Sequence, residues 1–133
     1  MAIAVAPICW TLLWWWSMPS VDLTWPLRAP VPFLLSAVVY PVLEEIVFRG
    51  GVQTYLLGRP RLGRCRFGIS GANVLTSLVF SLFHLVAHAP LWALAVFVPS
   101  LVFGYFRERH DSLKSPIALH VFYNGGYFWL FVA

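Results

Sequence analysis

Two adjacent carboxylates, Glu44 and Glu45, and the cation of Arg49 interrupt a stretch of apolar residues that is long enough to cross a membrane. A charged side chain at the centre of a membrane helix costs about 2.5–3.5 kcal/mol, and pairing or a wet cavity recovers part of that cost. Glu45 and Arg49 are four residues apart, so they share a helix face and are predicted to form an ion pair. Glu44 is rotated by about 100° from Glu45 and is left without that partner. A carboxylate at membrane depth without such a partner indicates a functional site.

Two further apolar segments carry polar pairs with the same spacing. "LVFSLFHLVAHAP" places Phe80 four residues before His84, and "PIALHVFYNGG" places His120 four residues before Asn124. A single His or Asn in a helix bundle is ordinarily a core residue that bonds to a neighbouring helix. Here three separate segments each contribute at least one polar group. We therefore predict that Glu44, His84, His120 and Asn124 form one polar site inside a helix bundle.

The chemistry that suits this polar set is hydrolysis of an amide bond by water. A carboxylate in an apolar site is poised to accept a proton from water, and His84 can share that role. His120 and Asn124 can donate hydrogen bonds to a developing oxyanion. Cys9 and Cys65 have no His close in sequence that would activate them. The set therefore predicts water, rather than a side chain, as the nucleophile.

Two other interpretations use the same residues. His84 and His88 are four residues apart and could ligate zinc together with His120 and Glu44, although a complete HExxH motif is absent. Alternatively, the polar groups could form a proton path in a transporter or immunity protein that is not an enzyme. His88 lies beside Pro90 at the end of its segment, which favours a packing role for this residue.

The composition predicts that membrane helices hold these groups. Hydrophobic residues make up 60% of the 133-residue chain and charged residues 11%, whereas soluble domains contain about 25% charged residues. A soluble domain of this length has too little interior to hide so much apolar surface. We expect one integral membrane domain, residues 1–133, with an all-α fold. Its helices would form a polytopic membrane bundle with the catalytic site inside.

Five segments are predicted to be transmembrane helices by their length and apolar character. They are residues 2–18, 31–57, 70–89, 90–106 and 116–133. Pro41 lies inside the second segment and is expected to kink it. The first segment has no basic residue ahead of it and no clear cleavage site, so we expect a retained helix rather than a secretory signal.

Basic residues in the linkers predict the orientation of these helices. Seven of the nine Lys and Arg residues lie in two linkers, residues 58–68 and 107–115. The positive-inside rule places both linkers in the cytoplasm. Alternation of five helices then gives a cytoplasmic N-terminus and an extracytoplasmic C-terminus in the cell membrane. The basic charge would contact anionic lipid, and no surrounding polar domain favours a nucleic-acid partner.

This arrangement raises a question about depth in the membrane. If the third helix begins at Ser70, His84 lies about 21 Å along it, whereas His120 lies about 7 Å along a fifth helix that begins after Ser115. For the two His residues to meet, either residues 68–73 lie outside the hydrocarbon core or the fifth helix begins deeper.

The three motifs resemble those of the CAAX protease and bacteriocin-processing family, also called Abi proteins. The motifs read "EEIVFR" at residues 44–49, "FSLFH" at 80–84 and "HVFYN" at 120–124. The resemblance covers residues 31–133 and leaves the first helix outside the family's catalytic core. It implies a glutamic-type intramembrane endopeptidase that uses no metal or other cofactor and cuts a membrane-anchored protein substrate.

The resemblance also implies a role for each motif residue. Glu44 and His84 would activate the water, and His120 and Asn124 would form the oxyanion hole. Three further residues would support the motifs by ion pairing or packing: Glu45, Arg49 and Phe80. In its small size the chain resembles the family members associated with processing of C-terminal sorting signals in prokaryotes.

Overall fold

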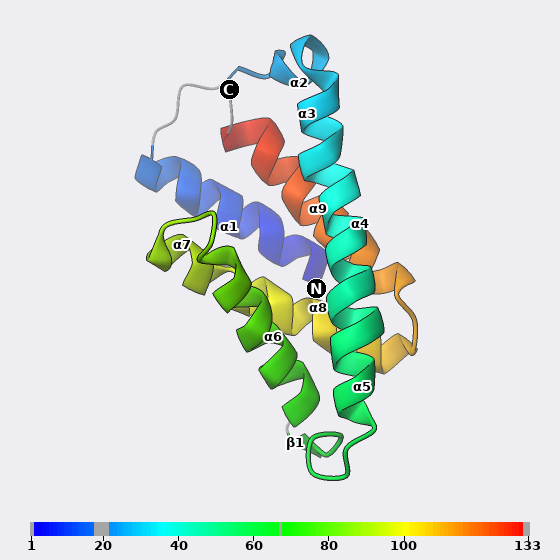
Figure 1. Ribbon diagram of the computed structural model, residues 1–133. Helices are drawn as coiled ribbons and strands as arrows, with labels where there is room; N and C mark the ends of the chain where they lie inside the picture. Colours follow the sequence, from blue (N-terminus) through cyan, green and yellow to red (C-terminus); the bar gives the residue numbers. More distant parts are fainter. Residues whose placement is uncertain (1, 18–21, 67, 132–133) are drawn as a thin grey trace. The chain divides into compact units, whose positions relative to one another are not determined.

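The computed structural model describes residues 2–17, 22–66 and 68–131 of the chain. These residues form two compact units. The first comprises the chain up to Leu43 together with the chain from Ile117 onward, and the second comprises Glu44–Pro116. Both units consist mainly of helices, which confirms the predicted all-α class (Figure 1).

The first unit contains the N-terminal helices and most of the last helix. Its elements are α1 (Ala2–Ser17), α2 (Trp25–Arg28), α3 (Pro30–Leu34), η1 (Leu35–Val39) and α9 (Lys114–Phe131). The indole Nε1 of Trp25 donates to the carbonyl oxygen of Phe128 at 2.9 Å, and the Trp10 ring lies 5.3 Å from that of Phe122. A Cβ at Gly126 would lie 2.1 Å from the Trp10 ring. The small Gly126 therefore allows α1 to approach α9 closely.

One helix continues from Pro30 to Leu57. It alternates α-helical turns with the wider turns of a π-helix: α3, η1, α4 (Tyr40–Glu45), η2 (Ile46–Gln53) and α5 (Thr54–Leu57). Pro41 follows η1 closely and has no N–H to donate. The amide of Tyr40 donates to the carbonyl of Leu35, five residues earlier. The kink expected at Pro41 therefore corresponds to π-helical turns near this residue, and the helix itself continues to Leu57.

The second unit adds a short hairpin and further helices to the C-terminal part of that long helix. Its remaining elements are β1 (Cys65–Arg66), β2 (Ile69–Ser70), α6 (Gly71–His84), α7 (Pro90–Ala95) and α8 (Phe97–His110). The antiparallel hairpin was not expected, because strands of two residues are too short to show an alternating pattern. Gly68 in its turn has a φ of 80°, which glycine adopts without steric cost. Helices α6 and α8 are joined where Asn73 Nδ2 donates to the Leu101 carbonyl at 3.0 Å.

The side chains of α6 are sorted in the opposite way to those of a soluble helix. Its buried face carries polar residues that are at most 1% exposed: Asn73, Thr76, Ser77 and Ser81. Its exposed face carries large apolar residues: Val74, Leu75, Leu78, Val79, Leu82 and Phe83. A helix at the surface of a soluble protein would bury its apolar face and expose its polar one. The arrangement fits a helix whose outer face meets lipid.

Among the described residues, two helices are long and apolar enough to cross a membrane, Pro30–Leu57 with 28 residues and Pro90–His110 with 21. Helix α6 is apolar but has 14 residues, and transmembrane helices need about 17–25. Helix α1 has 16 residues. The predicted ends of the first and last spans, at residues 18 and 133, lie outside the described residues. A helical membrane protein is therefore supported, with two spans of sufficient length.

Candidate active site

The ion pair predicted between Glu45 and Arg49 is present and fully buried. Arg49 Nη1 lies 3.1 Å from Glu45 Oε1, and both side chains are 0% exposed. Arg49 Nη2 also donates to the carbonyl oxygen of Ser100 at 2.9 Å and to its hydroxyl at 2.6 Å. A buried cation needs an opposite charge and hydrogen-bond acceptors. Glu45 supplies the charge, and Ser100 supplies two acceptor oxygens.

Two aromatic rings complete the surroundings of Arg49. The guanidinium carbon lies 4.9 Å from the ring centroid of Phe80 and 5.6 Å from that of Phe103, within the range of cation–π attraction. Phe80 is buried, and its ring also meets that of Phe48 edge-on at 5.0 Å. Arg49 therefore links η2 to α6 through Phe80, and to α8 through Phe103 and Ser100.

Glu44 lies beside this ion pair but is held differently. Its side chain is half-buried, whereas Glu45 is fully buried. The Glu44 carboxylate attracts the Arg49 guanidinium, less strongly than the Glu45 carboxylate does. The direct ion pair is formed with Glu45, as expected, and the attraction of Glu44 adds to it. A rotation of about 100° takes Glu44 off the shared face, but electrostatic attraction reaches further than a direct ion pair.

His84 is the last residue of α6, and the preceding turn holds its ring. The Nδ1 atom lies 2.9 Å from the carbonyl oxygen of Phe80. Because a carbonyl oxygen only accepts, Nδ1 carries the proton in this hydrogen bond, and in the neutral ring Nε2 keeps its lone pair. The Phe80 ring packs against the His84 ring with 4.5 Å between centroids. This geometry leaves Nε2 as a proton acceptor, which is the form that a general base requires.

His88 stacks on His84 just beyond the end of α6. The two rings lie 5.8 Å apart with planes inclined by 20°, and the His88 side chain is exposed. Within residues 2–17, 22–66 and 68–131, no cluster of three or more His, Cys, Asp or Glu side chains that could hold a metal ion is found.

His120 and Asn124 lie on α9 in the first unit. His120 is buried, and Asn124 Nδ2 donates to the carbonyl oxygen of Ser36 in η1 at 3.3 Å. Their spacing of four places both on one face of the helix. The seven predicted site residues thus fall into two groups, with five in the second unit and these two in the first.

A polar seam, buried except for the half-buried Glu108, runs between three helices of the second unit, and most of it was not predicted. Its residues recur every four positions along each helix, so each set lies on one helix face. The sets are Glu45, Arg49 and Gln53 on the long helix, Asn73, Ser77 and Ser81 on α6, and Ser100, Gly104 and Glu108 on α8. The four-residue repeat is visible in the sequence, but small and hydroxyl-bearing residues are common wherever membrane helices pack. Their presence alone does not indicate a functional site.

Glu108 ties the helices together at one end of the polar seam. Its Oε1 accepts hydrogen bonds from Gln53 Nε2 at 2.7 Å and from the Ser70 hydroxyl at 2.6 Å. Ser70 is the N-cap of α6, and its oxygen accepts from the amide of Asn73 at 2.9 Å. The Cys65 thiol lies 3.7 Å from the other oxygen of Glu108. One carboxylate therefore fixes the start of α6 against α8 and the long helix.

Gly104 allows α8 to approach α6 within the polar seam. A Cβ at this position would lie 2.0 Å from Oδ1 of Asn73 and 2.5 Å from its Cγ. We expect Gly104→Ala to displace the Asn73 side chain, break its hydrogen bond to Leu101 and lower the free energy of unfolding by about 1–3 kcal/mol. Thermal unfolding of the purified protein in detergent measures this loss.

Gly51→Ala is the matched control for this substitution. Gly51 lies on the long helix, and the nearest atom that its Cβ would meet is 4.0 Å away. Alanine favours a helix over glycine, so this variant should unfold at the wild-type temperature or above it. Equal unfolding temperatures for Gly104→Ala and Gly51→Ala would show that the contact with Asn73 does not restrict position 104.

The sequence matches the family model for type II CAAX prenyl endopeptidase Rce1-like proteins over residues 26–126. The chain belongs to this family. The family predicted from the three motifs is therefore confirmed, and the matched range contains all three motifs and begins after α1. No curated protein and no solved structure matches the chain.

Membership of this CAAX endopeptidase family implies a protease that acts in a membrane on membrane-associated proteins. The arrangement of side chains in the second unit agrees with a membrane setting. The chain exposes apolar residues on α6 and buries hydroxyl, amide and charged groups between the helices of this unit. A buried polar interior is what chemistry on a polar peptide bond requires at membrane depth.

Proposed function

We propose that the protein is a glutamic-type intramembrane endopeptidase, in which Glu44 and His84 activate a water molecule that attacks a peptide bond. The observation that carries this proposal is that the family match spans all three motifs. Two features of the second unit support it. Glu44 is half-buried beside the cation of Arg49, and the hydrogen bond from His84 Nδ1 leaves Nε2 as a proton acceptor.

The proposed reaction moves one proton in each of two steps. Glu44 accepts a proton from water as the water oxygen bonds to the carbonyl carbon, while Nε2 of His84 accepts a hydrogen bond that orients the water. The tetrahedral intermediate then collapses, the carbon–nitrogen bond breaks, and Glu44 passes its proton to the leaving amine. Arg49 attracts the Glu44 carboxylate, which is the form that accepts the proton from water.

His120 and Asn124 are proposed to donate hydrogen bonds to the oxyanion. The amide of Asn124 has two N–H groups, and its hydrogen bond to the Ser36 carbonyl engages one of them. We expect Asn124→Ala to lower kcat by roughly 10²–10³-fold with little change in KM, as loss of a single oxyanion-hole donor does. Steady-state kinetics at matched amounts of folded protein measures the effect.

Ser36→Ala is the control for that variant, because Asn124 bonds to the backbone oxygen of Ser36 and the substitution leaves this oxygen in place. Its kcat should stay close to that of the wild type. A rise in KM with kcat unchanged in Asn124→Ala would assign the amide to substrate binding and contradict its role at the oxyanion.

The proposed function is tested by co-expressing the full-length protein with membrane-anchored candidate substrates and determining their termini by mass spectrometry. The candidates carry either a prenylated C-terminal CAAX sequence or a C-terminal sorting signal. Cleavage that requires Glu44 and withstands a strong zinc chelator supports a glutamic protease. Loss of cleavage on chelation, restored by zinc, would favour a zinc site at His84, His88, His120 and Glu44. Folded protein that cleaves neither class would favour a transporter or immunity protein.

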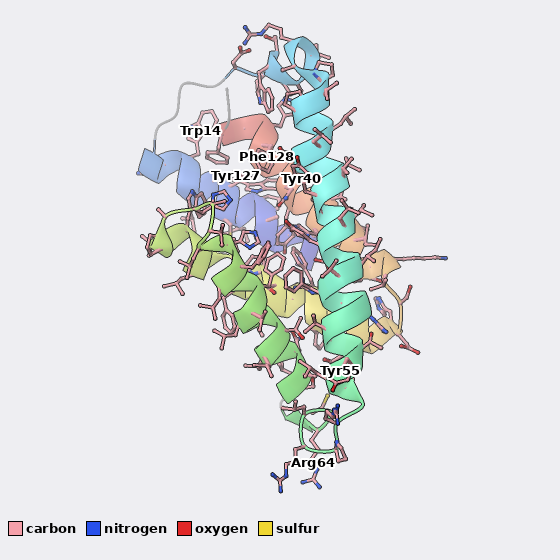
Figure 2. The ribbon with its side chains drawn as sticks, in the orientation of Figure 1. Trp14, Tyr40, Tyr55, Arg64, Tyr127 and Phe128 are labelled. Carbon is pink, nitrogen blue, oxygen red and sulfur yellow. The ribbon has the colours of Figure 1, made fainter. Side chains whose placement is uncertain are left out.

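We also propose that the chain crosses the cell membrane five times, with its N-terminus in the cytoplasm and its C-terminus outside. The loop after α5 carries the exposed basic residues Arg59, Arg61 and Arg64, and Arg64 lies near the tip of this loop (Figure 2). Basic loops favour the cytoplasm. The cluster of Ser70, Asn73 and Glu108 at the start of α6 supports placing residues 68–73 outside the hydrocarbon core.

Cys65 reports the side of the membrane on which this loop lies. It is exposed, and in a Cys9→Ala background it is the only thiol of the two-cysteine chain. We expect a membrane-impermeant maleimide to label Cys65 in inside-out vesicles but not in intact cells. A reporter fused after Ala133, by contrast, should be extracytoplasmic. Labelling of Cys65 from outside intact cells would overturn the five-span proposal.

The rate of this labelling should depend on pH in a defined direction. Desolvation, and then the Glu108 carboxylate, raise the pKa of the Cys65 thiol. The thiolate is the reactive form, so a raised pKa leaves little of it near neutral pH. Labelling in detergent should accelerate as the pH rises toward that pKa. Glu108→Gln should accelerate it at constant pH, because the variant removes the negative charge.

A further inference from the structure

Three buried oxygens near the polar seam have no hydrogen-bond partner among the residues that the structure describes. They are Oγ1 of Thr76, Oγ of Ser81 and Oε1 of Gln53, and each side chain is at most 1% exposed. Leaving a buried polar group unsatisfied costs about 1–3 kcal/mol. Ser77 on the same helix does bond within the protein, to Oδ1 of Asn73 at 3.1 Å. Ser77 therefore serves as a comparison on the same helix, because its hydroxyl is bonded within the protein.

One of these oxygens lies on the helix face that carries Phe80 and His84, and a second lies at the edge of that face. Thr76 and Ser81 are four residues before and one residue after Phe80, and His84 follows three residues after Ser81. Offsets of three and four residues place Thr76, Phe80 and His84 on one helix face, with Ser81 at its edge. A polar group bound at Thr76 or Ser81 would therefore lie along α6 toward His84.

The third oxygen lies on the long helix, one turn from Arg49. The amide nitrogen of Gln53 is engaged, because it donates to the Gly104 carbonyl at 3.1 Å and to Glu108 at 2.7 Å. The side-chain oxygen Oε1 of Gln53 can therefore accept a hydrogen bond from another donor. Arg49 in turn packs on the Phe80 ring at 4.9 Å. The seam thus leads from Glu108, past Gln53, to Arg49 and the second-motif residue Phe80.

We propose that Thr76, Ser81 and Gln53 bind a short file of water molecules that supplies the hydrolytic reaction. The inference rests on the proposed function, since each hydrolysed peptide bond consumes one water and apolar surroundings exclude bulk water. Buried waters typically sit where they make two to four hydrogen bonds to otherwise unsatisfied groups. The two hydroxyls can each accept and donate, and the Gln53 oxygen can accept.

A dry seam and a hydrated seam respond differently when a hydroxyl is removed. In a dry seam the hydroxyls of Thr76 and Ser81 are unsatisfied, so Thr76→Val and Ser81→Ala should stabilise the protein and leave turnover unchanged. In a hydrated seam the same changes remove binding groups for water. Turnover should then fall, with little gain in stability.

Hydroxyl-radical footprinting by synchrotron X-rays detects such waters directly, because radicals formed from a bound water oxidise the side chain next to it. Phe80 is the probe, since it is an oxidisable ring with 2% exposure. In the full-length protein in detergent, we expect Phe80 to be oxidised despite this burial. The double variant Thr76→Val with Ser81→Ala should reduce both Phe80 oxidation and kcat several-fold.

Two control variants test whether the hydroxyl groups of Thr76 and Ser81 cause the effect. Thr76→Ser keeps a hydroxyl at position 76 and should retain wild-type oxidation and turnover. Ser77→Ala removes a hydroxyl that already has a protein partner, so it should leave Phe80 oxidation unchanged. A fall in oxidation as large in Ser77→Ala as in the double variant would overturn the assignment to Thr76 and Ser81.

The proposal of a file of water molecules would be contradicted if Phe80 is not oxidised in the wild-type protein. It would also be contradicted if the double variant keeps wild-type oxidation and turnover. These outcomes are distinct from failure of the proposed function. Footprinting needs no substrate, so it reads hydration whatever the reaction. The proposed function fails instead if folded Glu44→Gln retains full activity.

Discussion

Glu45→Gln should unfold at a markedly lower temperature than the wild type and give less folded protein, while the folded fraction keeps most of its turnover. Glu45 and Arg49 are 0% exposed and lie 3.1 Å apart. Removing one partner of a buried ion pair leaves an uncompensated charge and costs about 3–5 kcal/mol. Glu44 attracts Arg49 less strongly than Glu45 does, so it compensates only part of the loss. Thermal unfolding in detergent measures the change.

Asp111→Asn is the matched control, because Arg107 and Asp111 form an ion pair with the same spacing of four whose carboxylate lies in solvent, while the Arg107 side chain is 13% exposed. The pair lies 2.8 Å apart, and the Asp111 side chain is 94% exposed. Exposed pairs contribute little to stability, and asparagine tolerates the left-handed φ of 44° at this position as aspartate does. A similar fall in unfolding temperature for Asp111→Asn and Glu45→Gln would show that burial does not account for the effect.

The helices of this fold could be predicted from runs of apolar residues, because a membrane helix must satisfy its own backbone hydrogen bonds over a fixed length. The π-helical turns were harder to predict. Pro41 signals a disturbance, but whether a helix kinks or widens depends on how neighbouring turns re-satisfy their carbonyls. The hairpin at Cys65–Arg66 and Ile69–Ser70 has two-residue strands, which leave no periodic trace in the sequence.

The candidate site was predicted best where spacing alone decides geometry. A separation of four residues on a helix fixes a shared face, and the Glu45–Arg49 pair is present as expected. Contacts between helices leave no such local signal. The bonds of Arg49 to Ser100 and of Glu108 to Gln53 and Ser70 join residues that are 38–55 positions apart. The path of the connecting loops brings these residues together, and the local sequence does not encode that path.

Glu44→Gln should abolish turnover in a protein that folds as the wild type does. The substitution keeps the shape of the side chain but removes the group that accepts a proton from water. General acid–base groups typically contribute about 10²–10⁴-fold to the rate, so a loss of that size is expected. Glu44 is half-buried, and Glu45 remains as the direct partner of Arg49. The unfolding temperature should therefore change far less than in Glu45→Gln.

Water activation by Glu44 is tested most directly by measuring kcat/KM for the wild type, Glu44→Gln and Glu45→Gln on one substrate, at equal amounts of folded protein. We predict near-background turnover with wild-type unfolding for Glu44→Gln, and near-normal turnover with a lowered unfolding temperature for Glu45→Gln. Full activity in folded Glu44→Gln would contradict a glutamic protease with Glu44 as its base.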